Sequence, residues 1–131
     1  MEARTHLGLD RSLCGEPEEV GDGFARVGMT TTPCMRADER GLVHGGFVFG
    51  QVDHAAMLAV NDPNVVLGSA DVRFLAPVAV GQRVVAEARV VEASGRKRRV
   101  QVRADVDGAA VLSGELVAFV LDGHVLDGRR G

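Results

Sequence analysis

The sequence has no tryptophan and no tyrosine, and its five phenylalanines, 4% of the chain, are its only aromatic residues. Aromatic side chains are the platforms on which nucleic acid bases stack, so this shortage argues against a base-binding surface. The formal net charge of -3 points the same way, because duplex binding usually requires a cationic surface. Nucleic acid is therefore not an expected partner.

Cysteine is also scarce. Cys14 and Cys34 have no CxxC spacing and no histidines clustered beside them, so neither a metal site nor a redox motif is predicted, and both thiols are expected to be free. No run of eighteen apolar residues occurs, and residues 1–7 lack the apolar core of a signal peptide. We therefore expect a cytoplasmic protein that does not interact with a membrane.

The remaining composition is ordinary for a globular protein, with 46% hydrophobic and 25% charged residues among 131. This length suits one domain with a sizeable core and is too short for two. We expect that domain to cover residues 23–122. Residues 1–22 form an N-terminal segment of undetermined role, in which residues 15–19 resemble a surface loop, and residues 123–131 form a C-terminal tail.

One helix and five strands are predicted in the domain. The helix covers residues 46–61, which are apolar almost all round, so the rest of the domain should enclose it. Alternating and β-branched stretches predict strands over residues 24–32, 65–75, 84–90, 98–106 and 110–121. Turns at Ser94-Gly95 and Asp107-Gly108 predict antiparallel hairpins. The expected fold is α+β, with one strand, the helix, and then a four-strand meander.

A single helix cannot cover both faces of such a sheet. The economical arrangement is an antiparallel sheet wrapped around one long central helix, with another surface of the domain pairing with a second subunit. We therefore expect a homo-oligomer.

Asp53 is the acid within the predicted helix. An ionised carboxylate in apolar surroundings is costly unless it is paired, hydrogen-bonded or used in chemistry, so Asp53 is a functional candidate. Gly45 and Gly46 supply a second half of a site, because the first helical turn leaves N–H groups unpaired at its positive end. Such donors can hold an anion or the oxyanion of an attacked carbonyl. The plain alternative is a tight loop entering a core helix, with His44 as a packed or capping residue.

Four features occur together: GLVHGG at residues 41–46, Asp53 nine positions after His44, FLAPV at residues 74–78 and GQRV at residues 81–84. This combination resembles the hotdog fold, and specifically the phenylacetic-acid-pathway (PaaI-type) subgroup of acyl-CoA thioesterases, over residues 24–121. The resemblance implies hydrolysis of an acyl-CoA to a free acid and coenzyme A, without a metal or redox cofactor. It also implies a homodimer or a dimer of dimers.

The resemblance assigns roles to particular residues. It implies that Asp53 is the nucleophile or the general base for water, and that the backbone N–H of Gly46, beside Gly45, binds the thioester carbonyl. His44 matches the motif histidine, which shapes the turn and assists positioning. The sequence leaves open whether Asp53 attacks the carbonyl directly, and it does not name the acyl group.

Four further residues each allow two interpretations. Asp38 stands where these enzymes often have an Asn that contacts the attacking water, and a carboxylate there either faces solvent or changes the pKa of the base. Ser69 lies near a family Ser or Thr that can orient water, or it is a simple strand hydroxyl. Arg96 and Arg98 either contact the phosphates of coenzyme A or belong to a solvated hairpin tip.

The spacing between Gly46 and Asp53 predicts how the site is assembled. They are seven residues apart, which places them about 10 Å apart along one helix. One carbonyl cannot readily contact both, so we expect Gly46 of one chain to face Asp53 of another across a two-fold axis.

Two other functions remain open. Hotdog domains also serve as ligand sensors in a lipid-synthesis repressor, so a non-catalytic acyl-CoA-binding module is the alternative. Residues 1–22, however, are too short for a helix-turn-helix and are not basic. Hotdog hydratases and dehydratases share the fold but normally place their Asp and His differently.

Overall fold

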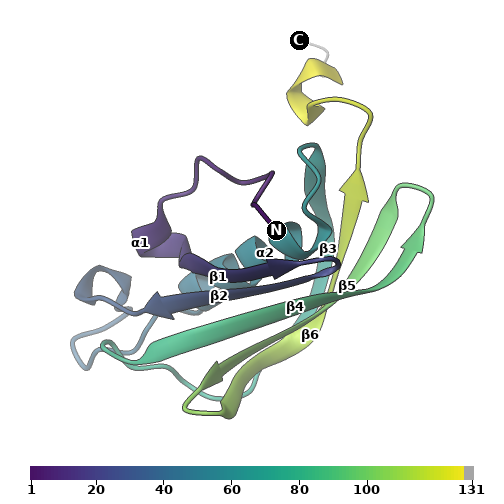
Figure 1. Cartoon of the computed structure of the whole chain (residues 1–131). Helices are drawn as coiled ribbons and strands as arrows, with labels where there is room; N and C mark the ends of the chain where they lie inside the picture. Colours follow the sequence, from purple (N-terminus) through teal and green to yellow (C-terminus); the bar gives the residue numbers. More distant parts are fainter. Residues whose placement is uncertain (129–131) are drawn as a thin grey trace.

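The computed structural model describes residues 1–128, in which a six-stranded antiparallel sheet curls around one long helix (Figure 1). This arrangement confirms the predicted α+β fold. The sheet order is β1-β2-β4-β5-β6-β3. The elements are α1 (Arg11–Cys14), β1 (Glu16–Gly21), β2 (Phe24–Thr30), α2 (Gly45–Val60), β3 (Val65–Phe74), β4 (Arg83–Ser94), β5 (Lys97–Val106) and β6 (Ala109–Val120), with single 3-10 turns at Pro33–Met35 and Val125–Gly128. Residues 129–131 of the predicted C-terminal tail lie outside the described residues.

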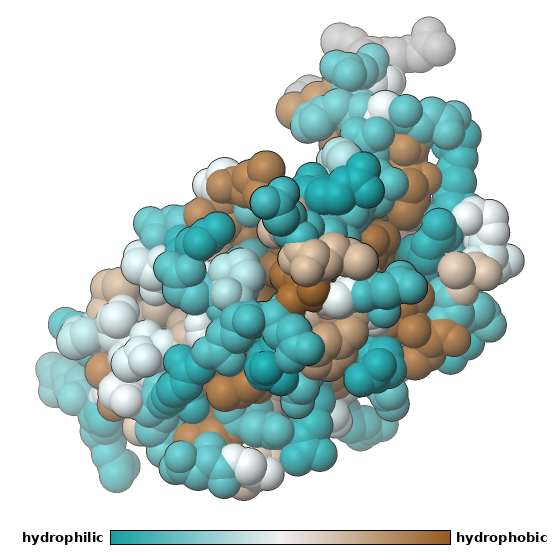
Figure 2. All heavy atoms as spheres, viewed as in Figure 1, coloured by the Kyte–Doolittle hydropathy of each residue, from teal (hydrophilic) through white to brown (hydrophobic). Residues whose placement is uncertain are grey.

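The core lies between α2 and the concave face of the sheet. Val52, Ala55 and Leu58 of α2 are fully buried, and they pack over small sheet residues such as Ala86 and Ala104. The alternating residues of the same strands point outward and are mostly charged or polar. Hydrophilic residues accordingly cover most of the face seen in Figure 2, with hydrophobic ones showing between them.

Two sequence expectations about the sheet are wrong. The first concerns residues 16–19, expected in a loop, which lie in β1 and pair with β2. β1 is an edge strand with mostly exposed residues and an irregular register between Pro17 and Glu19, so it lacks the hydrophobic alternation by which a strand is recognised.

The second concerns the order of the strands. β4, β5 and β6 form the predicted hairpins, but β3 pairs with β6 at the far edge rather than with β4. Residues 75–82 carry the chain back from that edge, and Val78 O accepts a hydrogen bond from Val43 N (2.8 Å) just ahead of α2. Alternation identifies strands but not their neighbours, so the sequence pattern did not reveal this crossing.

The N-terminal segment, to which the sequence assigned no role, lies over α2. Asn61 ends the helix in a left-handed conformation (φ 54°). Its side chain accepts a hydrogen bond from Arg4 N (2.7 Å) and donates one to Glu2 O (2.8 Å). A second tie joins His54 Nδ1 to Cys14 O (3.0 Å). The start of the chain is therefore fastened along the helix that carries Asp53.

Candidate active site

The candidate residues Gly46 and Asp53 lie on one stripe of α2, together with Gly50. At 100° per residue, these three positions fall within a narrow arc of the helix, on the side opposite the sheet-facing Gln51 and Ala55. A Cβ added at Gly50 would meet no atom within 4 Å. The stripe is therefore open within one chain.

Asp53 is partly buried, and its Oδ1 is enclosed without a hydrogen-bond partner among residues 1–128. Burial raises the pKa of Asp53 above its ordinary value, and the neighbouring His54 opposes part of that rise. Buried polar atoms are normally hydrogen-bonded, so an enclosed carboxylate oxygen with no partner needs a reason. A carboxyl group with a raised pKa beside an open face is suited to take up a proton or to attack a carbonyl.

His54 and Cys14 lie beside Asp53 and are not arranged to replace it. Burial lowers the pKa of His54, against the opposing effect of its hydrogen bond to Cys14 O. The imidazole is therefore neutral at pH 7. Burial raises the pKa of the Cys14 thiol, and nearby Asp10 and Asp53 raise it further, so this thiol stays protonated.

The start of α2 presents two free donors. His44 N donates to Met35 O (2.9 Å) and Phe47 N donates to His44 O (3.0 Å), whereas the N–H groups of Gly45 and Gly46 have no acceptor among the described residues. His44 is the N-cap but makes no side-chain capping bond. Its exposed ring packs edge-on against Phe47 at 6.1 Å. The arrangement leaves two amides, at the positive end of the helix dipole, available to a carbonyl oxygen or an anion.

Asp38 shapes the loop that leads into α2. Its Oδ1 accepts hydrogen bonds from Arg40 N (2.9 Å) and Leu42 N (3.2 Å), and the residue is exposed. Within one chain the carboxylate thus stabilises a turn.

The other predicted site residues lie away from α2. Ser69 is exposed on β3, beside a register irregularity of that strand. Arg96 forms an ion pair with Asp122, and Arg98 donates to the carbonyls of Gly95 and Lys97 at the β4–β5 turn. The structure therefore groups Gly45, Gly46 and Asp53 on one helix and does not join the remaining residues to them within one chain.

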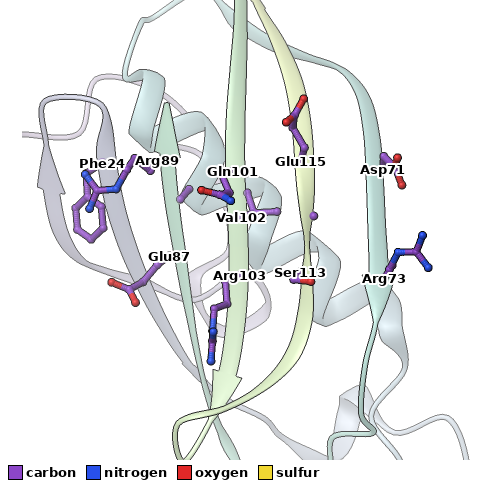
Figure 3. A pocket seen from close by; sticks show the side chains of 12 residues that line it. Phe24, Asp71, Arg73, Glu87, Arg89, Gln101, Val102, Arg103, Ser113 and Glu115 are labelled. Atoms are coloured by element: carbon purple, nitrogen blue, oxygen red, sulfur yellow. The ribbon is translucent and has the colours of Figure 1, made fainter. Parts of the chain in front are cut away.

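A hollow of about 720 Å³ lies on the outer face of the sheet, with α2 on the other side (Figure 3). Its lining is charged, and several of its groups already have partners. Arg89 stacks over Phe24 at 4.9 Å, and Glu115 binds Arg99 (2.9 Å). This hollow contains neither Asp53 nor the free amides.

A smaller groove of about 380 Å³ reaches Gly45 at the start of α2. Residues 74–78 form one wall, and Val43, Val48 and Val111 contribute to the rest. The sequence marks FLAPV as a motif, but its place in the wall of a groove was not predicted from the sequence.

Among residues 1–128, no three His, Cys, Asp or Glu side chains come together as a set of metal ligands. No helix in the described part of the chain is long and apolar enough to cross a membrane.

The curated relatives of this chain are longer proteins. Methylthioribose-1-phosphate isomerase of Aquifex aeolicus is 47% identical over 123 residues, which are 93% of this chain but 27% of that protein. Transcription factor FapR of Caldanaerobacter subterraneus is 30% identical over 88 residues, 67% of this chain and 44% of that protein. The chain thus spans less than half of either relative, and most of the isomerase lies outside the match.

Solved structures match the whole fold. An uncharacterized protein from Pyrococcus horikoshii has a TM-score of 0.96 at 49% identity, covering 97% of this chain and 98% of that one. A mutant of the phenylacetic acid degradation protein PaaI from Thermus thermophilus has a TM-score of 0.78 at 28% identity, covering 85% of this chain and 96% of that one. The sequence model of the Thioesterase superfamily matches residues 40–109, a span that includes α2, β3 and the free amides. This chain therefore belongs to the thioesterase superfamily, with the hotdog fold of its PaaI-type members.

Proposed function

We propose that this protein is an acyl-CoA thioesterase that hydrolyses an acyl-CoA to a free acid and coenzyme A. The observation that carries the proposal is the carboxylate of Asp53, whose enclosed Oδ1 has no hydrogen-bond partner among residues 1–128, on the same helix stripe as the free amide of Gly46. Family membership supports thioester chemistry, and these two groups supply what that chemistry needs.

The reaction divides between the two groups. The Gly46 N–H, with Gly45 beside it, donates to the thioester oxygen and stabilises the negative charge that develops there. Asp53 either removes a proton from water, whose oxygen attacks the carbonyl carbon, or attacks that carbon itself. The second route forms a mixed anhydride that water then hydrolyses. In both routes the C–S bond breaks, and coenzyme A leaves as a thiolate that takes up a proton.

We further propose that each site is shared between two copies of the chain, as the distance along α2 requires. The exposed edge of β3 supports this, because an edge strand offers unpaired backbone groups to a second strand. The charges along β3 also complement those of a second copy of the strand. Asp71 lies opposite the like-charged Glu115, and Arg73 lies opposite Ser113. A second β3, antiparallel and centred on Val72, places each Asp71 against Arg73 of the partner subunit.

We propose roles for the other predicted site residues as well, and that of Asp38 follows from its hydrogen bonds in the loop. His44 supports the turn that presents the amides, Asp38 holds the loop before it, and Ser69 is a candidate to orient water in the assembled dimer. Arg96 and Arg98 are proposed to face the phosphates of coenzyme A.

Asp53→Asn tests the function directly. The change preserves volume and removes the base or nucleophile, so kcat/KM for release of thiol from acyl-CoA should fall by about 10³-fold or more, while circular dichroism and acyl-CoA binding stay unchanged. Gly50→Ala, on the same open stripe, is a control that changes the stripe without touching the carboxylate, and it should keep the fold. Turnover of Asp53→Asn within a few-fold of the unmodified protein would contradict the assignment.

A non-catalytic acyl-CoA-binding module is the second candidate, because the similarity to the transcription factor FapR covers 67% of this chain. Asp53 argues against it, since a ligand sensor has no need of an unpartnered carboxylate in a partly buried position. The same assay separates the two functions. A module binds acyl-CoA without releasing thiol, and its Asp53→Asn variant binds equally well.

A further inference from the structure

We propose that the groove beside Gly45 holds the acyl group of the substrate and selects neutral, apolar acyl groups over those that end in a carboxylate. This inference rests on the proposed function, which identifies the amides of α2 as the donors to the thioester carbonyl. It adds the class of acyl group, which neither the sequence nor the comparisons specify.

All the side chains that line the groove are apolar. No charged or hydrogen-bonding side chain lines its volume of about 380 Å³; the lining residues are Val43, Gly45, Val48, Phe74, Leu75, Ala76, Pro77, Val78 and Val111. Asp38 and Arg40 line a separate hollow that shares Pro77 and Val78 with the groove, and neither charged residue lines the groove itself.

The position of the groove links it to the carbonyl. The ring of Phe74 lies 3.3 Å from the point that a Cβ at Gly45 would occupy, so the wall of the groove packs directly against the first turn of α2. A thioester whose oxygen accepts from the Gly46 amide therefore has the groove next to its carbonyl carbon. The acyl chain enters the groove of the same chain that supplies the amide.

The mouth of the groove carries large apolar side chains that the core does not use. Phe74, the last residue of β3, is 57% exposed, and Leu75, which follows it, is 52% exposed. Adjacent exposed apolar residues commonly mark a binding surface. An apolar acyl chain is an occupant that buries them.

The physical basis of selection is desolvation. Each methylene that enters the groove contributes favourably, whereas a carboxylate there loses its water and meets no charged or hydrogen-bonding side chain in exchange. Butanoyl-CoA and succinyl-CoA form a matched pair, because both acyl groups have four carbons and only the second ends in a carboxylate. We expect kcat/KM for butanoyl-CoA to exceed that for succinyl-CoA by about 100-fold. From acetyl- to hexanoyl-CoA, kcat/KM should rise by about fourfold per methylene.

A charge placed on the groove wall tests the location. Leu75→Lys puts an ammonium group at an exposed position of the wall and should lower the butanoyl-to-succinyl ratio by about tenfold. Val91→Lys adds the same charge at a similarly exposed position of β4, outside the groove, and should leave the ratio unchanged. Equal turnover of the two thioesters, or an equal change of their ratio in both variants, would overturn the proposal.

A binding measurement separates this inference from the proposed function. Calorimetry with Asp53→Asn compares butanoyl-CoA and succinyl-CoA without turnover, and the same preference and the same Leu75→Lys effect are expected in Kd. A preference in binding without thiol release from any thioester would refute the thioesterase and keep the groove. Thiol release without a preference between the two thioesters would support the thioesterase and refute the role of the groove.

Discussion

Gln51 and Asp53 are two polar residues, two positions apart on the same apolar helix, but they lie on different faces and differ in their hydrogen-bond partners. Gln51 faces the sheet with no exposure, and its Nε2 donates to Val27 O (2.9 Å) and Val84 O (2.8 Å), so it bridges β2 and β4. Asp53 faces the open stripe, and its Oδ1 has no partner among the described residues. One side chain fastens the helix to the sheet, and the other is left available.

The two residues also share a feature, because Gln51 Oε1 is likewise enclosed and finds no hydrogen-bond partner within residues 1–128. The difference is charge. A neutral amide oxygen without a hydrogen bond costs little compared with a carboxylate that must stay ionised to act. An unsatisfied atom therefore indicates chemistry only where it is ionisable and borders a face that a substrate or a second chain can reach.

The largest effect is expected in an experiment that tests whether a second chain completes the active site at the open stripe of Asp53. Gly46→Pro removes the amide donor and Asp53→Ala removes the carboxylate, so each variant alone should be inactive. After subunit exchange about half of the dimers are mixed and each has one intact site, which should restore about a quarter of wild-type activity. Thiol release before and after mixing measures this recovery.

Two controls accompany the mixing experiment. Gly46→Ala keeps the N–H group but crowds the ring of His44, 3.1 Å from the added Cβ, and so separates donor loss from crowding. Asp71→Arg should block recovery by placing like charges across the β3 pair, and Asp71→Arg with Arg73→Asp should restore it. No recovery after verified exchange would place the site within one chain.

Gln51→Leu tests the structural half of the comparison. The variant keeps a similar volume but removes both hydrogen bonds to the strands, so the free energy of unfolding should fall by about 2 kcal/mol. Denaturant unfolding measures the change, with Gln51→Glu as a control that retains the shape and replaces the donor. If Gln51→Leu were as stable as the unmodified protein, the bridge would not hold the helix in place.

Asp53→Asn should have the opposite, smaller effect on stability. Because the folded pKa of Asp53 is raised, its burial costs stability above the raised pKa, and this cost disappears below the ordinary pKa of an aspartate. The variant should therefore be more stable at pH 7 by about 1 kcal/mol, and the gain should vanish as the pH falls below about 4. Thermal unfolding across this range measures it. A variant less stable than the unmodified protein at pH 7 would mean that the carboxylate has a hidden partner.

The smallest expected effect concerns Arg98, which does not lie on α2. If Arg98 contacts a phosphate of coenzyme A, Arg98→Glu should raise KM for acyl-CoA by about threefold to tenfold and leave KM for the same acyl group on a short thiol unchanged. Arg96 is already paired with Asp122, so Arg96→Glu is expected to change KM less. Equal changes for both substrates would place this cluster in a solvated turn.

Most of the fold was predictable from local pattern. The apolar run of α2 and the alternation of β4, β5 and β6 each follow from residues close together in sequence. β1 was missed because an exposed edge strand has no hydrophobic pattern. The pairing of β3 with β6 was missed because it joins residues far apart, which alternation does not encode.

The candidate site was predictable in part for a similar reason. Asp53 and the glycines stand out because a buried acid and a GG turn are unusual in themselves. The ties from Asn61 and His54 to the N-terminal segment involve backbone groups, and no sequence signal marks a carbonyl as an acceptor. The groove beside Gly45 exists only because residues 75–82 cross back from the edge of the sheet, and the predicted meander contained no such crossing.

The strand order has a consequence for the synthesis of the chain. β2 pairs with β4, which ends at Ser94, and β3 pairs with β6, which ends at Val120, so each strand gains its inner neighbour only after a long stretch of later sequence has been made. Until these later strands have been made, α2 lacks the part of its packing that β4, β5 and β6 supply. Such non-local pairing slows folding and leaves hydrophobic surface exposed to other nascent chains. A product that stops before Ala109 should therefore aggregate rather than fold.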